Sequence, residues 1–320
     1  MTYLENLKNL TDALTASVDI RPAISEPVSS AVFVGSGDSL SSALLAQAYG
    51  HRAFSSGDIT FMGRVPVGAK TVVGISYSGT SGATVQAIRL AREAGLHTIA
   101  ITSNATSPLA DAADEIQIVP TLSVDENVPC AGHLMLGLGV AAVCGEDTSG
   151  ATSALATQLG GFASVLESAI KRLPATAPTG VSVLSLPDLR GAADFWMLKL
   201  IEATGITVRT VALEESGHVD YFVGPEPHLT IQLIGQHGGF RFERLALALE
   251  LTGQTLLPVV APANTAEQST RDEIIFELAG AALGTLVAEA AAARWGRPLF
   301  RGGAVNMDAS HIKLDGIPVS

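Results

Sequence analysis

The stretch that decides the fold is Ile75-Ser76-Tyr77-Ser78-Gly79-Thr80-Ser81-Gly82-Ala83-Thr84. It ends an apolar, β-branched run that begins at Thr71, and a helical pattern follows it directly. A junction of this kind between a strand and a helix directs backbone N–H groups and hydroxyls to one point, where the helix dipole favours an anion. The stretch has no lysine and does not match the nucleotide-triphosphate loop. So many hydroxyls around a glycine indicate a phosphate held by neutral donors, rather than turn and N-cap residues alone.

Strand-like and helix-like segments alternate along the whole chain, which is typical of a parallel sheet covered on both faces. We expect strands at 31–34, 71–75, 98–101, 115–119, 181–186, 207–213, 229–234 and 253–260. We expect helices at 4–17, 41–49, 83–94, 130–143, 153–172, 189–203, 240–251 and 272–294. The sequence therefore predicts an α/β protein.

The similar rhythm of the two halves suggests an internal duplication. A polar string at 145–152 reads as a linker or helix boundary. We therefore expect an N-terminal domain, residues 1–150, with the phosphate-binding loop, and a C-terminal domain, residues 151–320. The second half has Leu186-Pro187-Asp188 at the position expected for a copy of the serine-rich turn, so the halves are expected to divide their labour.

The composition excludes several classes of protein. The 320 residues carry a net charge of −12, which argues against nucleic acid and anionic membranes as partners. Cys130 and Cys144 form no metal-type cluster and suggest a reduced, cytoplasmic setting. The N-terminus does not read as a signal peptide. The longest apolar runs, such as 279–292, are interrupted by Gly and Glu, so we expect no membrane span.

A dinucleotide-binding domain is a weak alternative. Gly35-Ser36-Gly37 follows a strand, but Leu40 stands where the fingerprint has its third glycine. No acidic residue closes the next strand. We therefore expect no nucleotide cofactor, and no cofactor of another kind.

Two motifs in the first half resemble the sugar isomerase (SIS) family of phosphosugar-binding domains. Val34-Gly35-Ser36-Gly37-Asp38-Ser39 is similar to the family's first glycine–serine turn, and Ser76-Tyr77-Ser78-Gly79-Thr80-Ser81 to its phosphate loop. The match continues to Asp114 and covers residues 30 to 120. The resemblance implies two flavodoxin-like, doubly wound SIS domains in tandem. It also implies that the sugar phosphate is held by Gly37, Ser39, Ser76, Ser78 and Ser81.

The second half resembles, more distantly, the isomerase domain of glucosamine-6-phosphate synthase and the archaeal phosphoglucose/phosphomannose isomerases. Leu198-Lys199-Leu200-Ile201-Glu202 is similar to the helix that bears a catalytic glutamate, and Glu214-Glu215-Ser216-Gly217-His218 to the segment that bears the ring-opening histidine. The resemblance implies Glu202 as the base and His218 as the ring-opening group. It also implies a homodimer with a shared site, because in relatives the histidine comes from the partner subunit. The turn at Glu126-Asn127-Val128-Pro129 is followed by Cys130-Ala131-Gly132 instead of the synthase's serine–threonine–lysine.

The chemistry of aldose–ketose interconversion needs such residues. A proton moves between C1 and C2, so the site needs a base, a ring-opening group and an electrophile for the oxyanion. A half-buried glutamate suits the base; otherwise Glu202 is a solvated residue on a helix face. Lys199 either stabilises the enediolate or solvates a helix face. His218 opens the ring or is an exposed loop histidine.

The remaining histidines and the C-terminal tail complete the candidates. His133 lies on an apolar helical face, which favours a satisfied core position. No histidines share a metal-ligand spacing, so no metal site is expected. The family often closes its site with a C-terminal lysine, a role for which Lys313 and His311 are candidates.

Three functions are compatible with these residues. The first is a phosphosugar isomerase acting on a hexose or hexosamine 6-phosphate through an enediol. The second is an aminosugar-phosphate deaminase or deglycase, which uses the same proton shuttle and then expels an amine. The third is a non-catalytic phosphosugar-binding regulator; the acidic chain lacks the basic DNA-binding part that such proteins carry.

Overall fold

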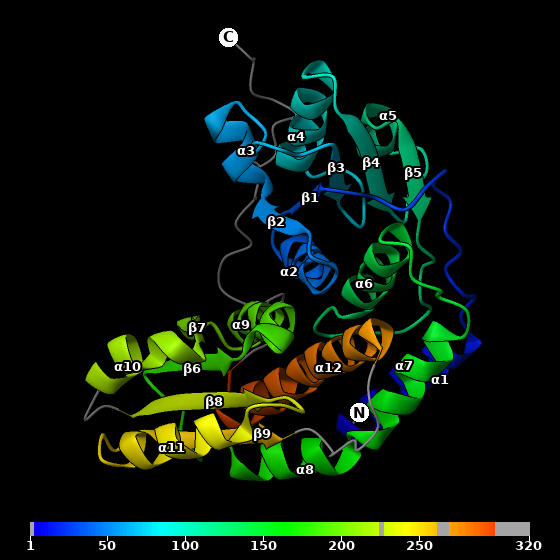
Figure 1. The fold of residues 1–320 in the computed structure, drawn as a ribbon. Helices are drawn as coiled ribbons and strands as arrows, with labels where there is room; N and C mark the ends of the chain where they lie inside the picture. Colours follow the sequence, from blue (N-terminus) through cyan, green and yellow to red (C-terminus); the bar gives the residue numbers. More distant parts are fainter. Residues whose placement is uncertain (1–2, 224–226, 261–268, 298–320) are drawn as a thin grey trace.

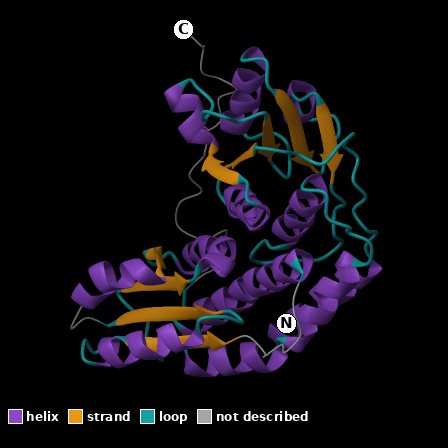
Figure 2. Ribbon diagram, viewed as in Figure 1, coloured by secondary structure: helices purple, strands orange, loops and turns teal. Residues whose placement is uncertain are grey.

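The computed structural model describes residues 3–223, 227–260 and 269–297, which form two α/β lobes (Figure 1). Each lobe contains one parallel sheet, of five strands in the first lobe and four in the second. Helices lie against both faces of the sheets (Figure 2). The predicted α/β class is therefore confirmed.

The first lobe is a sheet with the strand order β2-β1-β3-β4-β5. Its elements are β1 (Ala31–Gly35), α2 (Asp38–Leu44), η1 (Leu45–Tyr49), β2 (Arg52–Ser55), α3 (Ser56–Met62), β3 (Thr71–Ile75), α4 (Gly82–Glu93), β4 (His97–Thr102), α5 (Pro108–Ala112), β5 (Glu115–Ile118) and α6 (Ala131–Val143). Successive residues of β1 face opposite sides. Phe33 packs in the core with α2 and α6, whereas Val32 packs with α4 and α5. Burial on both faces explains why these strands read as continuous apolar runs.

The second lobe is a sheet with the strand order β7-β6-β8-β9. Its elements are α7 (Ala151–Gly161), α8 (Ala163–Arg172), β6 (Gly180–Ser185), η2 (Pro187–Leu189), α9 (Arg190–Thr204), β7 (Val208–Ala212), η3 (Leu213–Glu215), α10 (Ser216–Val219), η4 (Asp220–Phe222), β8 (His228–Ile234), α11 (Gly239–Glu250), β9 (Thr255–Val260) and α12 (Thr270–Arg294). Helices α8, α9 and α12 share one core with one face of this sheet, and α11 covers the other. The first helix, α1 (Tyr3–Ala16), packs on α7 and α12 through Leu7, Leu10 and Leu14.

The lobes meet along helices rather than along strands. Helix α2 packs on α9, and α6 packs on α12. One continuous apolar core therefore includes a face of each sheet. The division at residues 150 and 151 stays a prediction.

Helix α12 contains the apolar run at 279–292, and the whole helix is longer than that run. Its 25 residues are long and apolar enough, by length and composition, to cross a membrane. However, 83% of the most apolar window is buried inside the structure, where α12 contacts α6, α7, α8 and α9. In this fold it is a central packing helix, which explains its apolar circumference.

Several predicted boundaries were wrong for local reasons. The helix expected at 153–172 is two helices that meet at Phe162, directly after Gly160 and Gly161, because paired glycines are poor helix formers. The helix expected at 41–49 begins earlier, at Asp38, and becomes a 3₁₀ turn at Leu45. The short edge strand β2 and helices α3 and α5 were not predicted.

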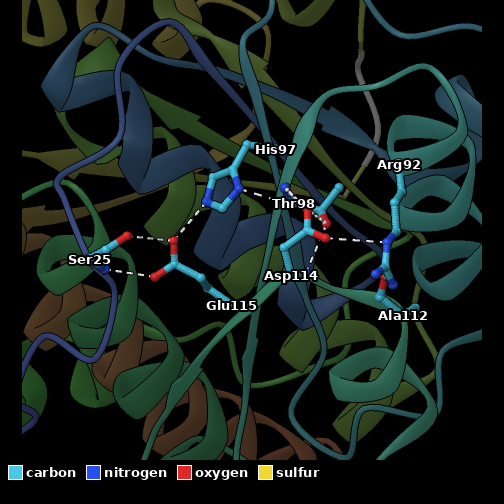
Figure 3. Close-up of polar contacts among 7 residues, drawn as sticks. All are labelled: Ser25, Arg92, His97, Thr98, Ala112, Asp114 and Glu115. Carbon is cyan, nitrogen blue, oxygen red and sulfur yellow. Dashed lines mark hydrogen bonds and ion pairs between the residues drawn. The ribbon is translucent and has the colours of Figure 1, made fainter.

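The amino ends of β4 and β5 carry a closed network of charged groups (Figure 3). His97 Nε2 lies 2.9 Å from Glu115 Oε1, and Arg92 Nε lies 3.2 Å from Asp114. Thr98 donates its backbone N–H and its hydroxyl to Asp114. Ser25, in the segment before β1, donates to both oxygens of Glu115. The network thereby fastens this segment to the sheet.

Candidate functional site

The carboxyl ends of β1 and β3 lie side by side in the first sheet. The strand order reverses here, because β2 lies on the far side of β1. Helix α2 leaves β1 toward one face and α4 leaves β3 toward the other. Open α/β sheets bind ligands in the crevice outside the strands at such a switch point. The turns 35–39 and 76–81 follow these two strands, so the structure brings both sequence motifs to the same edge of the sheet.

Glycines shape both turns. A Cβ at Gly35 would lie 2.4 Å from the carbonyl oxygen of Ser39, so no side chain fits between β1 and α2. Gly79 has a φ of +71°, and a Cβ there would lie 2.0 Å from Ser107 Oγ. The serine-rich turn thus needs glycine for its backbone conformation and for its close packing on the N-terminus of α5.

The hydroxyls of the serine-rich turn are bonded mostly to one another. Ser78 Oγ lies 2.8 Å from Thr80 Oγ1, and both side chains are exposed. Ser81 stands at the N-cap of α4, but its Oγ accepts from Thr84 instead of capping the helix. By contrast, serine side chains do cap α3, α5 and α12. The backbone N–H groups at the start of α4 therefore stand without a side-chain cap, beside hydroxyls that can rotate toward an anion.

A carboxylate of the second lobe lies at the same edge of the first sheet. Lys199 Nζ donates to Glu202 Oε2 over 2.9 Å and to Asp38 Oδ2 over 2.7 Å. Asp38 is the first residue of α2 and lies between Gly37 and Ser39, two of the predicted phosphate contacts. The side chain of Lys199 is fully buried, whereas those of Asp38 and Glu202 are 35% and 37% exposed. The structure thus joins Glu202 and Lys199 to the first glycine–serine turn.

Glu126 is a third acidic group near this ammonium. Its Oε1 accepts the backbone N–H groups of Cys130 and Ala131 at the start of α6. Burial raises the pKa of the Glu126 carboxyl, although these hydrogen bonds and the charge of Lys199 oppose the shift. The next residue, Gly132, packs against the ring of Tyr77 in the serine-rich turn. The start of α6 therefore lies between the serine-rich turn and Lys199.

Asp38 and Glu126 were missed as site residues from the sequence. Both stand within quoted motifs, but their importance comes from Lys199, more than 70 positions away in the chain, which bonds to Asp38 and whose charge acts on Glu126. For Asp38, the available signal was a charged residue in a turn otherwise made of glycine and serine. Sequence spacing alone does not identify such a partner.

His133 occupies the core position that was predicted. It is 3% exposed, its Nδ1 lies 2.9 Å from Ser42 Oγ, and its ring stacks on Phe195 with centroids 4.1 Å apart. Burial lowers the pKa of His133 to about 3, so the ring is neutral. It supports the α2–α9 contact rather than contacting ligand.

His218 is not brought to Glu202 within one chain. It lies on the one-turn helix α10 and is exposed, where a loop was expected. Glu202 is in the last turn of α9, near the amino end of β7, whereas His218 follows the carboxyl end of that strand. Five residues of strand span about 16 Å. Lys313 and His311 lie outside the described residues.

A large cleft between the lobes lies at the other end of the α2–α9 pair. It measures about 470 Å³ and lies between the edge strands β2 and β7, with Arg190 and Asp194 of α9 in its wall. Arg190 and Glu202 are separated by about 18 Å of helix. None of the predicted site residues lines this cleft.

No group of three or more His, Cys, Asp or Glu side chains suited to a metal ion occurs in the described ranges, 3–223, 227–260 and 269–297. The cluster around Lys199 instead contains an ammonium, which would compete with a cation for the same carboxylates.

Comparisons with known proteins found solved structures with a similar fold. No curated protein matches the chain. A glucosamine-6-phosphate deaminase from Thermotoga maritima has a TM-score of 0.72 at 17% identity, over 93% of this chain and 96% of that one. The C-terminal domain of glucosamine-fructose-6-phosphate aminotransferase from Francisella tularensis has a TM-score of 0.69 at 13% identity, over 93% and 95%. The tagatose-6-phosphate ketose/aldose isomerase from Escherichia coli has a TM-score of 0.66 at 17% identity, over 94% and 89%.

These similarities establish a shared two-lobe fold. At the level of sequence, residues 28–130 match the family model of the SIS domain. This segment contains both turns of the switch point and ends at Cys130, the N-cap of α6. Residues 28–130 of this chain therefore form a SIS domain, as the two motifs predicted.

Proposed function

We propose that this protein is a phosphosugar isomerase that interconverts aldose and ketose forms of a hexose or hexosamine 6-phosphate. The observation that carries the proposal is the position of Glu202, whose ammonium partner Lys199 is bonded to Asp38 in the first turn of the switch point. In this proposal, residues 1–150 supply the phosphate-binding turns. Residues 151–320 form a second SIS domain that supplies the base.

The phosphate is assigned to the serine-rich turn. Ser76, Ser78 and Ser81 contribute hydroxyls, and the start of α4 contributes backbone N–H groups, with Ser39 and Gly37 on the neighbouring turn. Neutral donors suit a dianion in a protein of net charge −12, because the helix dipole and local N–H groups act at short range.

Glu202 is assigned the proton transfer between C1 and C2. It takes the proton from one carbon of the open-chain sugar, and the enediolate that results is protonated on the other carbon. Lys199 donates to Glu202 and is positioned to orient its carboxylate. No step requires a cofactor.

Ring opening is assigned to His218 of the partner subunit in a homodimer. The exposed apolar side chains near α10 support this arrangement: Tyr221 and Phe222 of η4 are 55% and 76% exposed, and Leu247 of α11 is 67% exposed. We expect Phe222→Glu with Leu247→Glu to yield monomers that keep their fold and lose activity. An unchanged dimer of full activity would exclude this surface as the interface.

A deaminase or deglycase is the second candidate. It is favoured by the likeness to the T. maritima glucosamine-6-phosphate deaminase over nearly the full length of both chains. Glu202 would perform the same proton transfer, and the amine would then leave.

The test is a thermal-shift screen of hexose and hexosamine 6-phosphates, followed by product analysis for each ligand that stabilises the protein. Ketose formation without ammonia supports the isomerase, and ammonia release supports the deaminase. Binding without turnover of any ligand would support a phosphosugar-binding regulator and contradict both enzymes.

A further inference from the structure

The ammonium of Lys199 is shared between two carboxylates from different lobes. Asp38 Oδ2 lies 2.7 Å from Nζ and Glu202 Oε2 lies 2.9 Å from it. The stem of Lys199 is fully buried, and Nζ lies 4.9 Å from the centroid of the Phe195 ring. Burial opposes the charged form, but the two carboxylates outweigh it and raise the pKa of Lys199. The ammonium therefore stays charged across the neutral pH range.

Burial acts on the other titratable groups near the ammonium. Burial raises the pKa of the Cys130 thiol and of the Glu126 carboxyl at the start of α6. His133 on α6 is neutral, as described above. Burial also raises the pKa of Asp194, which accepts from Ser41 one turn along α9. Asp38 and Glu202 are the two carboxylates that form ion pairs with Lys199.

A buried ammonium alone would make Glu202 a poor base. An opposite charge within about 4–6 Å favours the ionised form of a carboxyl, with pKa effects of about 1–3 units. A base held so strongly in its ionised form accepts a proton weakly, and proton transfer works best when the base titrates near the operating pH. A second carboxylate on the same ammonium offsets this effect while the hydrogen bond that orients Glu202 is kept.

We propose that Asp38 is a positioning residue that neutralises Lys199, so that Lys199 orients Glu202 without weakening it as a base. This inference rests on the proposed role of Glu202. The base then depends on both lobes: the second lobe supplies Glu202 and Lys199, and the first supplies the balancing charge. A shift of α2 against α9 would separate Asp38 from Lys199 and change the basicity of Glu202.

The test compares kcat/KM against pH for Asp38→Asn, Asp38→Glu and Lys199→Met, using the sugar phosphate identified in the screen. In Asp38→Asn the full charge of Lys199 acts on Glu202, so the acidic limb of the profile moves to lower pH by about one unit. Because the base is weaker, the plateau falls about tenfold. In Lys199→Met the positive charge is lost, so the acidic limb moves in the opposite direction, to higher pH. Asp38→Glu keeps the charge and restores the position of the limb.

A merely structural role for Asp38 would lower activity and leave the limb in place, and that result overturns the inference. If Asp38→Asn does not fold, judged by circular dichroism, the other two variants decide. The inference is contradicted if the acidic limb of Lys199→Met lies at or below the pH of the wild-type limb. It is also contradicted if the acidic limb of Asp38→Glu is displaced from the wild-type limb by a full pH unit. Glu202→Gln separates this failure from that of the function: full activity of Glu202→Gln refutes the proposed base. An inactive Glu202→Gln with an unshifted Asp38→Asn refutes only the role of Asp38.

Discussion

The two ends of the first sheet use polar residues in opposite ways. At the amino ends of β4 and β5, every charged group in Figure 3 has a partner of opposite charge or a hydrogen-bond donor within the network. At the carboxyl ends of β1 and β3, exposed hydroxyls bond mainly to one another, and α4 begins without a side-chain cap. Polar groups that satisfy one another stabilise the fold, whereas preorganised donors without a fixed partner indicate a ligand site.

The largest expected effect at the carboxyl edge is that of Glu202→Gln. Removal of a general base lowers kcat by about 10²–10⁴-fold, while ligand binding and thermal stability stay near the wild-type values. The measurement is steady-state kinetics with a thermal-shift assay of the bound ligand. Glu167→Gln, an exposed glutamate on α8, is the control and should leave kcat unchanged. An equal loss in both variants would contradict the assignment.

Ser78→Ala tests the phosphate turn. Loss of a hydrogen bond to a charged group weakens ligand binding by about 10–100-fold, with little change in stability because Ser78 is exposed. The matched control is Ser269→Ala, which removes the N-cap of α12. It should lower the free energy of unfolding by about 1 kcal/mol and leave ligand binding intact. Titration calorimetry and denaturant unfolding separate the two outcomes.

Glu277 in the second lobe should make the stability of the protein depend on pH. Its carboxylate accepts the N–H of Ala192 at the start of α9, and burial raises its pKa to about 8. Because the folded pKa lies above the unfolded value of about 4.3, the contribution of Glu277 to stability is full below pH ~4.3 and is lost as the pH rises through 8. Glu277→Gln keeps an acceptor for Ala192 but does not titrate. Between pH 5 and 8, we expect the free energy of unfolding of this variant, measured in urea, to fall less than that of the wild type, by on the order of a few kcal/mol. The same pH dependence in both proteins would refute this role of Glu277.

The smallest expected effect is at the amino edge. Hydrogen bonds from Thr98 and the charge of Arg92 outweigh the burial that opposes them and lower the pKa of Asp114. Hydrogen bonds from Ser25 and the charge of His97 do the same for Glu115. Lowered folded pKa values stabilise the protein above the unfolded values of about 3.9 and 4.3, and this contribution is lost as the pH falls below them.

The double variant Asp114→Asn with Glu115→Gln should therefore be less stable than wild type at pH 7, by about 1 kcal/mol or less because the pairs are partly exposed. It should show a flatter loss of stability between pH 5 and 3. Its kcat and KM should match the wild type, since the network lies at the opposite end of the sheet. Altered kcat or KM with unchanged stability would indicate that the amino edge contributes to function and not to stability, contrary to this comparison.

Local signals were enough to predict most of the sheet. Strand β3 was predicted with the observed bounds, because a β-branched run stops at a turn that only glycine can make. The boundary failed at Phe162, where the long apolar pattern continues but the preceding Gly160 and Gly161 interrupt the helix. The edge strand β2 is half exposed and four residues long, so it has too few buried positions for a clear pattern.

The local motifs of the site could be predicted from the sequence, but the contacts that bring them together could not. The serine-rich turn and the i, i+3 pair of Lys199 and Glu202 are local patterns, and each could be read from neighbouring residues. The contact of Lys199 with Asp38 depends on how α9 packs against α2, which sequence spacing does not encode. His218 is not brought to Glu202 within one chain, and its proposed role depends on a second copy of the protein.

The most direct test of the account is a crystal structure of Glu202→Gln with the sugar phosphate that stabilises it. The account predicts the phosphate within hydrogen-bond distance of Ser76, Ser78 or Ser81 and the start of α4. It also predicts C1 and C2 about 3–3.5 Å from the carboxamide of residue 202. A phosphate bound instead in the cleft between β2 and β7, beside Arg190, would contradict it.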